Sequence, residues 1–336
     1  MAIRTVEDRE HQEFRAAFLE RTGGDVDGCH IGMKHIYWTE TDQEKFCAYI
    51  CARAPFNTRR VWEGREHGDR WHARCSTASM VVSFFGTKGG TGTTTLAVNA
   101  AADIRHLTAG SVVIVDLKTG PGDVSLFLGL RPHHSLLTAI DRVSWRDPGE
   151  MARLMTHHAC GLHALASGDE FGRPGARDED GVEQTLRCLA GLYDFVVIDA
   201  GSTLMPATAA ALQLSDAVLL VANPDVPCLR NLQRLIDAVR LSGVSSERLR
   251  VALNRASEFG VLSTAQIERV LGLTIAYSVN SDYRTVASAV NAGVPVSSLR
   301  ESRLQRQLAA IAQSLADHAS HHERVRPERT QPSLSS

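Results

Sequence analysis

A stretch rich in glycine and threonine has the residue types of a phosphate-binding loop. Residues 86–95 read GTKGGTGTTT, between an apolar run at 81–85 and an alanine-rich run. Glycines let a backbone curl so that several N–H groups point at one anion. The start of a helix adds the positive end of its dipole. The order strand, glycine-rich loop and helix therefore predicts that phosphate groups bind here.

The loop departs from the standard P-loop pattern, in which Gly and four residues precede Gly-Lys and then Ser or Thr. Aligned on Gly92, the first glycine position holds Thr87 and the lysine position holds Thr93. Thr94 keeps the hydroxyl that would contact Mg²⁺, and an additional lysine, Lys88, precedes the glycine pair. The candidate phosphate-binding residues of the loop are Lys88, Gly89, Gly90, Thr91, Gly92, Thr93, Thr94 and Thr95.

Two acidic residues end apolar runs farther along the chain. The run at 111–116 ends in Asp116, and the run at 194–199 ends in Asp199. The second run has the Walker B pattern, a hydrophobic strand that ends in an acid. A carboxylate in that position can hold a hydrated Mg²⁺ beside bound phosphates.

Seven apolar runs, separated by helical patterns, must position these residues. Strands are predicted at 81–85, 111–116, 162–165, 194–199, 217–221, 249–253 and 273–278. Such alternation predicts an α/β fold of the P-loop NTPase kind, a mostly parallel, doubly wound sheet with helices on both faces. Ligands of these sheets bind at the C-terminal ends of the strands. The residues expected at those ends are Lys88, Thr94, Asp116 and Asp199.

Composition divides the chain into three predicted parts. Residues 1–79 are charged and contain three of the four tryptophans and four of the seven cysteines, so we expect a small separate N-terminal module. The polar segment at 61–75 is predicted to be irregular. Residues 80–318 form the P-loop domain, and the polar residues 319–336 are expected to be a disordered tail.

The N-terminal cysteines and histidines raise the possibility of a zinc site. Only Cys47 and Cys51 approach the close spacing of zinc ligands, so free thiols are the favoured interpretation. Seven scattered cysteines suit a reducing cytoplasm. The charged N-terminus predicts no signal peptide.

Charge and hydropathy restrict the partners. A formal net charge of -2 predicts no strong attraction to nucleic acid or to an anionic membrane. No apolar run is long enough for a transmembrane helix. The predicted helix at 302–318 lacks the large aromatic residues of a membrane-surface helix, which favours packing against the core.

The loop resembles the deviant Walker A loop of the MinD/ParA superfamily, roughly K-G-G-x-G-K-T-T, in which Lys88 matches the first lysine. The loss of the second lysine, at Thr93, resembles the CpaE/TadZ branch, whose members act in pilus assembly and polar localisation. The GDVSLFL run at 122–128 also resembles that branch. The resemblance covers about residues 80–318. It implies binding of ATP and Mg²⁺ and a homodimer in which Lys88 reaches the phosphates of the partner subunit.

The resemblance also implies roles for residues outside the loop. Asp116 would lie near the metal, whereas the acid that positions the attacking water is replaced by Lys118. Asn254 would read the edge of adenine, although a turn asparagine is the alternative, and Pro295 would lie beside the base. Lys118 either replaces the missing loop lysine or points to solvent. The implied catalytic residues are Asp116 and Asp199, and the implied Mg²⁺ ligands are Thr94, Asp116 and Asp199.

The leading functional hypothesis is an ATP-dependent dimer that positions a pilus or secretion machine. Hydrolysis is expected to be weak or absent, because Thr93 and Lys118 stand where the family has two catalytic charges. A protein partner could recruit it to a cell pole or to the inner face of the membrane. The alternatives are an active ATPase of partitioning or septum-site regulation and a scaffold that binds no nucleotide.

Overall fold

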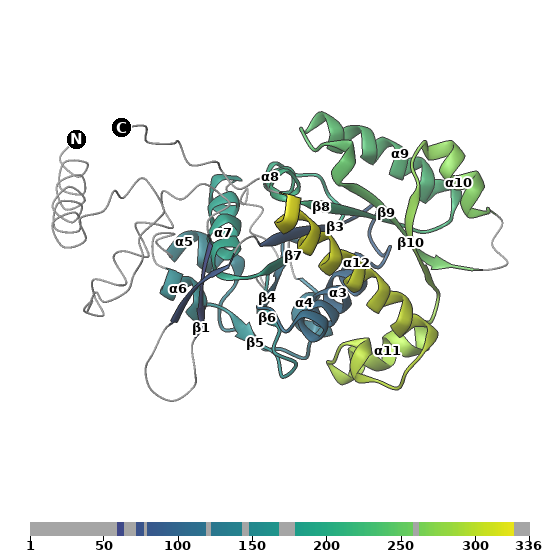
Figure 1. Ribbon diagram of the computed structural model, residues 1–336. Coiled ribbons are helices and arrows are strands. Elements are labelled where there is room, and N and C mark those ends of the chain that lie inside the picture. The colour runs from purple at the N-terminus through teal and green to yellow at the C-terminus, as the bar shows by residue number, and fades with distance from the viewer. Residues whose placement is uncertain are drawn as a thin grey trace. The chain divides into compact units, whose positions relative to one another are not determined.

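The computed structural model describes residues 59–63, 72–76, 79–118, 122–142, 148–167, 179–257 and 262–325 (Figure 1). All of them belong to one compact unit, Ile50–Ser336. The predicted zinc candidates Cys47 and Cys51 lie outside the described residues, as does most of the predicted N-terminal module. Both therefore stay predictions.

An eight-stranded sheet forms the centre of the described structure, in the order β10-β9-β8-β3-β7-β4-β6-β5. All neighbouring strands are parallel except β5, which pairs with β6 antiparallel. The α/β fold and its seven predicted strands are confirmed, and within this sheet only the two-residue β5 was not expected. The strands are β3 Met80–Gly86, β4 Val112–Asp116, β5 Thr156–His157, β6 His163–Leu165, β7 Phe195–Asp199, β8 Ala217–Ala222, β9 Leu249–Ala256 and β10 Ile275–Asn280.

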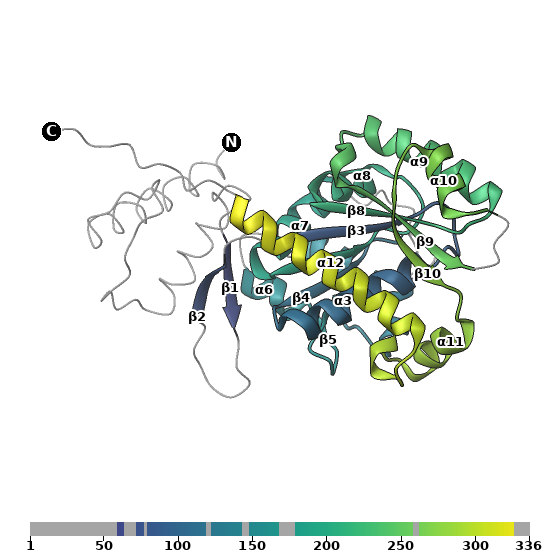
Figure 2. The same ribbon diagram turned by 45° about the vertical axis from the view of Figure 1, so that its right-hand side comes forward.

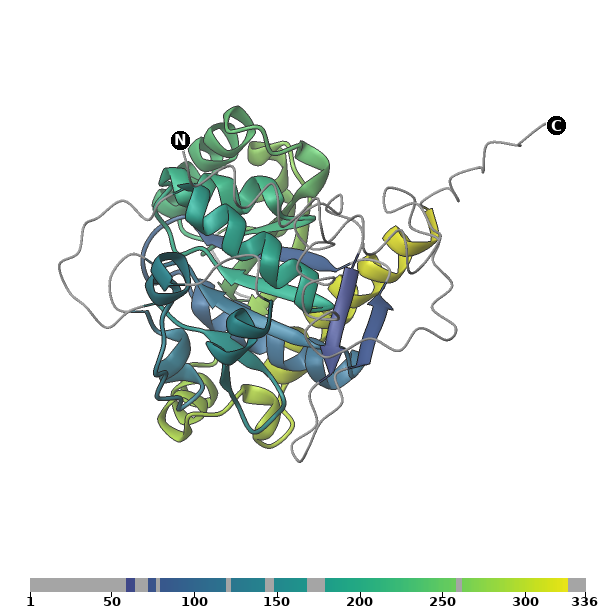
Figure 3. The ribbon, with the colours of Figure 1, turned by 90° about the vertical axis from the view of Figure 1, so that its left-hand side faces the viewer.

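Helices cover both faces of this sheet (Figures 1 and 3). One face packs against α5 Leu136–Arg142, α6 Pro148–Arg153, α7 Glu179–Leu192, α8 Pro206–Leu214, α9 Val226–Leu241 and α10 Thr264–Leu271. The other face packs against α3 Thr93–Thr108, α4 Val124–Phe127, α11 Tyr283–Ala292 and α12 Arg303–Val325. Two short 3₁₀ helices, Ser246–Arg248 and Val296–Ser298, precede β9 and α12 in the chain.

The alternation of side chains along the strands produces the two cores. In β3, Val81 and Phe85 point to one face, while Val82 and Phe84 point to the other, and all four are buried. Because both faces are covered, the strands read in the sequence as continuous apolar runs. None of the described helices combines the length and apolar character that a membrane span needs.

The C-terminal helix α12 belongs to the core. It lies beside α3 on the same face of the sheet (Figure 2), and its apolar residues Leu304, Leu308, Ile311 and Leu315 are buried. The packing prediction for this helix is therefore confirmed. The helix continues to Val325, so the first residues of the predicted tail are helical.

The polar segment at 61–75 is not irregular throughout, which corrects the prediction made for it. The strands β1 Arg59–Glu63 and β2 His72–Ser76 pair antiparallel as a separate two-stranded sheet. Neither strand carries the apolar alternation on which a strand prediction depends, so the residue pattern does not indicate them.

Two glycines allow the turn after α4 to lie close to the turn after α11. Gly129 follows α4 with φ 59°, and Gly293 ends α11 with φ 65°, the left-handed conformation common at helix ends. A Cβ atom on Gly293 would lie 2.6 Å from the Cα atom of Gly129. Glycine at both positions thus keeps the turn after α4 against the segment that leads to Pro295.

Candidate functional site

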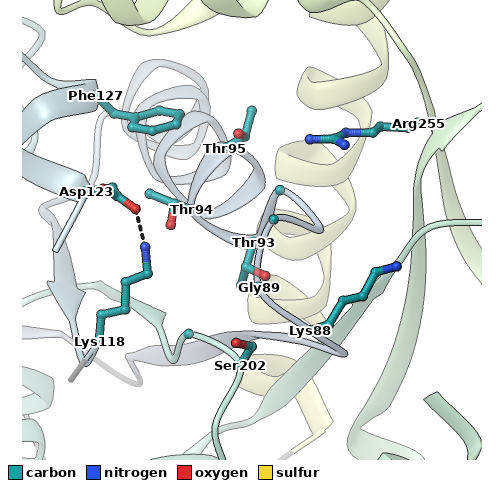
Figure 4. Close-up of a pocket in the computed structure, with 13 residues that line it drawn as sticks. Lys88, Gly89, Thr93, Thr94, Thr95, Lys118, Asp123, Phe127, Ser202 and Arg255 are labelled. Carbon is teal, nitrogen blue, oxygen red and sulfur yellow. Dashed lines mark hydrogen bonds and ion pairs between the residues drawn. The ribbon is translucent and has the colours of Figure 1, made fainter. Parts of the chain in front are cut away.

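A cavity of about 240 Å³ lies beside the glycine-rich loop, at the C-terminal edge of the parallel strands (Figure 4). This is the edge at which the fold class predicts a ligand. Its lining residues are Lys88, Gly89, Gly90, Gly92, Thr93, Thr94, Thr95, Lys118, Asp123, Phe127, Gly201, Ser202 and Arg255.

The loop turns sharply from β3 into α3. Gly90 and Gly92 have φ values of 79° and 91°, in the left-handed region that favours glycine. At Gly92 a Cβ atom would also clash with the side-chain amide of Asn254. No side chain caps the start of α3 at Thr93. Its first backbone N–H groups are therefore free to bind an anion, with the helix dipole in support.

Thr93 brings no charge to the position where the standard loop has lysine. Its hydroxyl forms a hydrogen bond of 3.2 Å with the hydroxyl of Thr91, and both residues are buried. This bond lies within the loop, so the side chain holds the loop's shape and does not extend across the cavity. Any cation that balances bound phosphates must come from elsewhere.

Asp116 and Asp199 meet below the loop. They are directly opposite each other in the neighbouring strands β4 and β7, and both are fully buried. The hydroxyl of Thr94 donates to Asp199 Oδ2 at 2.5 Å, while the N–H of Gly201 donates to Asp199 Oδ1 at 3.3 Å. The structure thus brings together the three residues that the sequence predicts as Mg²⁺ ligands.

The pair of acids is short of positive charge. Burial and, after it, the negative charge of the neighbouring Asp199 together raise the pKa of Asp116 to about 7, although the hydrogen bond from the N–H of Lys118 acts in the opposite direction. Burial also raises the pKa of Asp199. A divalent cation would relieve both carboxylates. Two carboxylates and a hydroxyl are oxygen donors of the kind that Mg²⁺ prefers, so the residues present fit that ion.

Lys118 lines the cavity and forms an ion pair with Asp123 Oδ2 (Figure 4). The same lysine has its pKa raised by Asp123 and by the two buried acids, which outweigh the effect of burial. Its side chain therefore faces the site, as one of the two sequence-based alternatives requires. Asp123 was missed by the sequence analysis, although it lies within the GDVSLFL run.

Lys88 forms an ion pair with the residue that caps the start of another helix. Its Nζ lies 3.3 Å from both carboxylate oxygens of Asp225, the N-cap residue of α9. The two side chains are 40% and 43% exposed. An exposed ion pair contributes little stability, so Lys88 can leave Asp225 for a stronger anion at small cost. Nothing in the sequence marked Asp225 as its partner.

Asn254 holds the loop against the end of β9. Its Nδ2 donates to the carbonyl of Thr91 at 2.8 Å, and its Oδ1 accepts from the N–H of Arg255 at 2.9 Å. The residue after Pro295 donates its N–H to Asn99 of α3. Neither Asn254 nor Pro295 lines the cavity. Contact with a base stays a prediction for both, and the structure adds a positioning role for Asn254.

Comparison with known proteins gives one family and one fold. The family model "Cellulose biosynthesis protein BcsQ" matches residues 79–275, more than half of the chain. The septum site-determining protein MinD of Thermotoga maritima is 25% identical over 233 residues, which cover 68% of this chain and 84% of that protein.

Solved structures share the fold. A ParA family ATPase from Chlorobium tepidum has a TM-score of 0.65 at 22% identity, covering 70% of this chain and 99% of that one. MinD from Pyrococcus horikoshii, complexed with Mg-ADP, has a TM-score of 0.62 at 19% identity, covering 73% of this chain and 98% of that one. At these identities the likeness concerns the fold alone.

The positioning role of Asn254 can be measured without any ligand. The variant Asn254→Ala leaves the buried carbonyl of Thr91 without its donor, so we expect the free energy of unfolding to fall by about 1–3 kcal/mol. Urea unfolding of the nucleotide-free protein measures this. Asn291→Ala, at an exposed position of α11, is the control and should change stability by less than about 0.5 kcal/mol. Equal midpoints for Asn254→Ala and the parent would show that the loop does not depend on Asn254.

Proposed function

Because the chain belongs to the family of the cellulose biosynthesis protein BcsQ, we propose that it binds ATP with Mg²⁺ in the cavity beside the glycine-rich loop. The MinD/ParA resemblance that the loop predicts is confirmed at the level of the superfamily. The observation that carries the proposal is the uncapped start of α3, next to a hydroxyl and two buried carboxylates at one edge of the sheet.

Different groups would bind the phosphates and the metal ion of the nucleotide. The N–H groups of the loop and of the first turn of α3 would bind the phosphates. Thr94, Asp116 and Asp199 would hold Mg²⁺, directly or through water, and the bound ion would neutralise charge on the phosphates. The relative from Pyrococcus horikoshii, complexed with Mg-ADP, supports this choice of ligand.

We further propose that hydrolysis is weak and that the bound state carries the function. The loop lacks a lysine at Thr93, and Lys118 stands where the superfamily has a water-positioning acid. The carboxylate of Asp123, which does line the cavity, is already paired with Lys118. The site therefore offers little to activate a water molecule.

Calorimetry and a phosphate-release assay test these two statements. We expect ATP to bind in the presence of Mg²⁺ and turnover to stay near background, on the order of 10²- to 10⁴-fold below a relative with both charges. Robust turnover that is lost in Asp199→Ala would instead make the chain an active ATPase. A parent protein that binds no nucleotide would favour the scaffold alternative.

A face-to-face homodimer would cover the cavity and bring Lys88 to the partner's nucleotide. Exposed apolar residues support a covered face. Val226 follows Asp225 and is 69% exposed, and Leu126 precedes the cavity residue Phe127 and is 60% exposed. The Lys88–Asp225 pair would open on dimerisation, because a triphosphate offers more negative charge than one carboxylate.

The two lysines should then have separable effects. Lys118→Ala removes a cation from the subunit's own site, so we expect weaker ATP binding, by about tenfold. Lys88→Ala should leave most of that affinity intact and mainly reduce ATP-dependent dimerisation. Calorimetry gives the affinities, and sedimentation velocity gives the oligomeric state. If Lys118→Ala binds ATP as tightly as the parent, Lys118 does not replace the missing loop lysine.

We propose that the protein positions or assembles a cellulose-synthesising machine. The description of its family supports this partner, whereas the GDVSLFL run favours the pilus or secretion machine of the CpaE/TadZ branch. Deletion of the gene should abolish extracellular cellulose, measured by dye binding and enzymatic digestion, and leave pili intact. Restoring the gene should restore cellulose. Loss of pili with normal cellulose would assign the protein to the other machine.

A further inference from the structure

Arg255 is the third cation that lines the cavity, beside Lys88 and Lys118. Lys88 pairs with Asp225, and Lys118 pairs with Asp123. Within the described part of the chain, no hydrogen bond or ion pair engages the guanidinium of Arg255, although this residue lines the cavity. A cation that faces a cavity without a counter-ion is available for an anionic ligand.

The backbone of Arg255 is fixed in an unusual conformation. Its φ is 55°, in the left-handed region that a residue with a side chain rarely adopts. The N–H of Arg255 donates to Asn254 Oδ1, and Asn254 is itself bonded to the carbonyl of Thr91. The strained residue is thereby tied to the loop. Strain of this kind is often found where a side chain must be aimed at a ligand.

The position of Arg255 indicates which part of a nucleotide it meets. Thr94 and Asp199 mark the end of the cavity where Mg²⁺ and the β- and γ-phosphates would lie. Figure 4 shows the Arg255 side chain extending from the end of β9 toward Thr95, on the side opposite Lys118 and Asp123. If the β- and γ-phosphates lie at the metal end, a triphosphate that runs along the loop would place its nucleoside end on the side of Arg255.

We propose that Arg255 binds the α-phosphate of the nucleotide in its own subunit. This inference rests on the proposed function, because it assigns a residue to the same ATP site. A guanidinium suits the role, since its planar donors match two phosphate oxygens at once. Arg255 thus supplies, at one end of the triphosphate, positive charge that Thr93 does not supply at the loop. Lys118 serves the opposite end.

The two ends respond differently to the choice of nucleotide. ATP and ADP both contain an α-phosphate, so loss of Arg255 weakens both by a similar factor. Lys118 lies at the metal end, so its loss weakens ATP more than ADP. The ratio of ATP affinity to ADP affinity therefore separates a contact to the α-phosphate from a contact to the γ-phosphate.

The test is calorimetry of the full-length protein with Mg-ATP and Mg-ADP. Arg255→Asn removes the guanidinium and keeps a residue that tolerates a left-handed backbone. We expect both affinities to fall about tenfold to a hundredfold, with their ratio preserved. Arg255→Lys should recover part of the loss. Arg269→Ala, at an exposed position of α10 away from the cavity, should leave both affinities unchanged.

Two results would overturn the inference. In one, Arg255→Asn binds ATP and ADP as tightly as the parent while urea unfolding shows an intact fold. In the other, it loses affinity for ATP alone, which would place Arg255 on the γ-phosphate. A parent protein that binds neither nucleotide would overturn the proposed function itself, so the two failures are distinguishable.

Discussion

The site depends on one tight connection, the turn from β3 into α3. Left-handed glycines at 90 and 92 bend the chain, and the amide of Asn254 packs where a side chain at Gly92 would stand. Gly86, at the end of β3, has no room for a Cβ atom because the hydroxyls of Thr91 and Thr93 lie against it. The helix therefore starts directly above the strand ends. Its N–H groups face the space over Asp116 and Asp199, which strand register sets side by side.

Around this turn, negative charge lies below the loop and positive charge lies above it. Two fully buried carboxylates lie beneath the loop, and three cations line the cavity above them. Two of those cations are restrained by exposed or half-exposed acids, so each can exchange a weak partner for a phosphate. Because Thr93 is neutral, the positive charge around the cavity comes from Lys88, Lys118 and Arg255. This arrangement is the basis of the proposal that nucleotide binding, and not hydrolysis, carries the function.

The family match and the motif resemblance agree at the superfamily level and diverge at the branch. The loop, the Asp116 strand and the Walker B strand are constrained by the geometry of phosphate and metal binding, and that geometry is common to the superfamily. A partner machine would be recognised by surfaces outside the phosphate and metal site, and the geometry of that site does not constrain them. The loss of the loop lysine suggested the CpaE/TadZ branch, whereas the family that matches is the one described by BcsQ.

The sequence alone determined the class of fold and the place of the site. Buried parallel strands read as apolar runs, and a phosphate-binding loop requires glycines that are visible in the chain. The tertiary structure decided which residues meet. Lys88 and Asp225 are far apart in sequence, Asn254 reaches back to the loop, and Arg255 adopts a left-handed backbone without being a glycine. A two-residue strand such as β5 is too short to form a pattern. Contacts of this kind depend on how the strands are ordered in the sheet, and no local run of residues records that order.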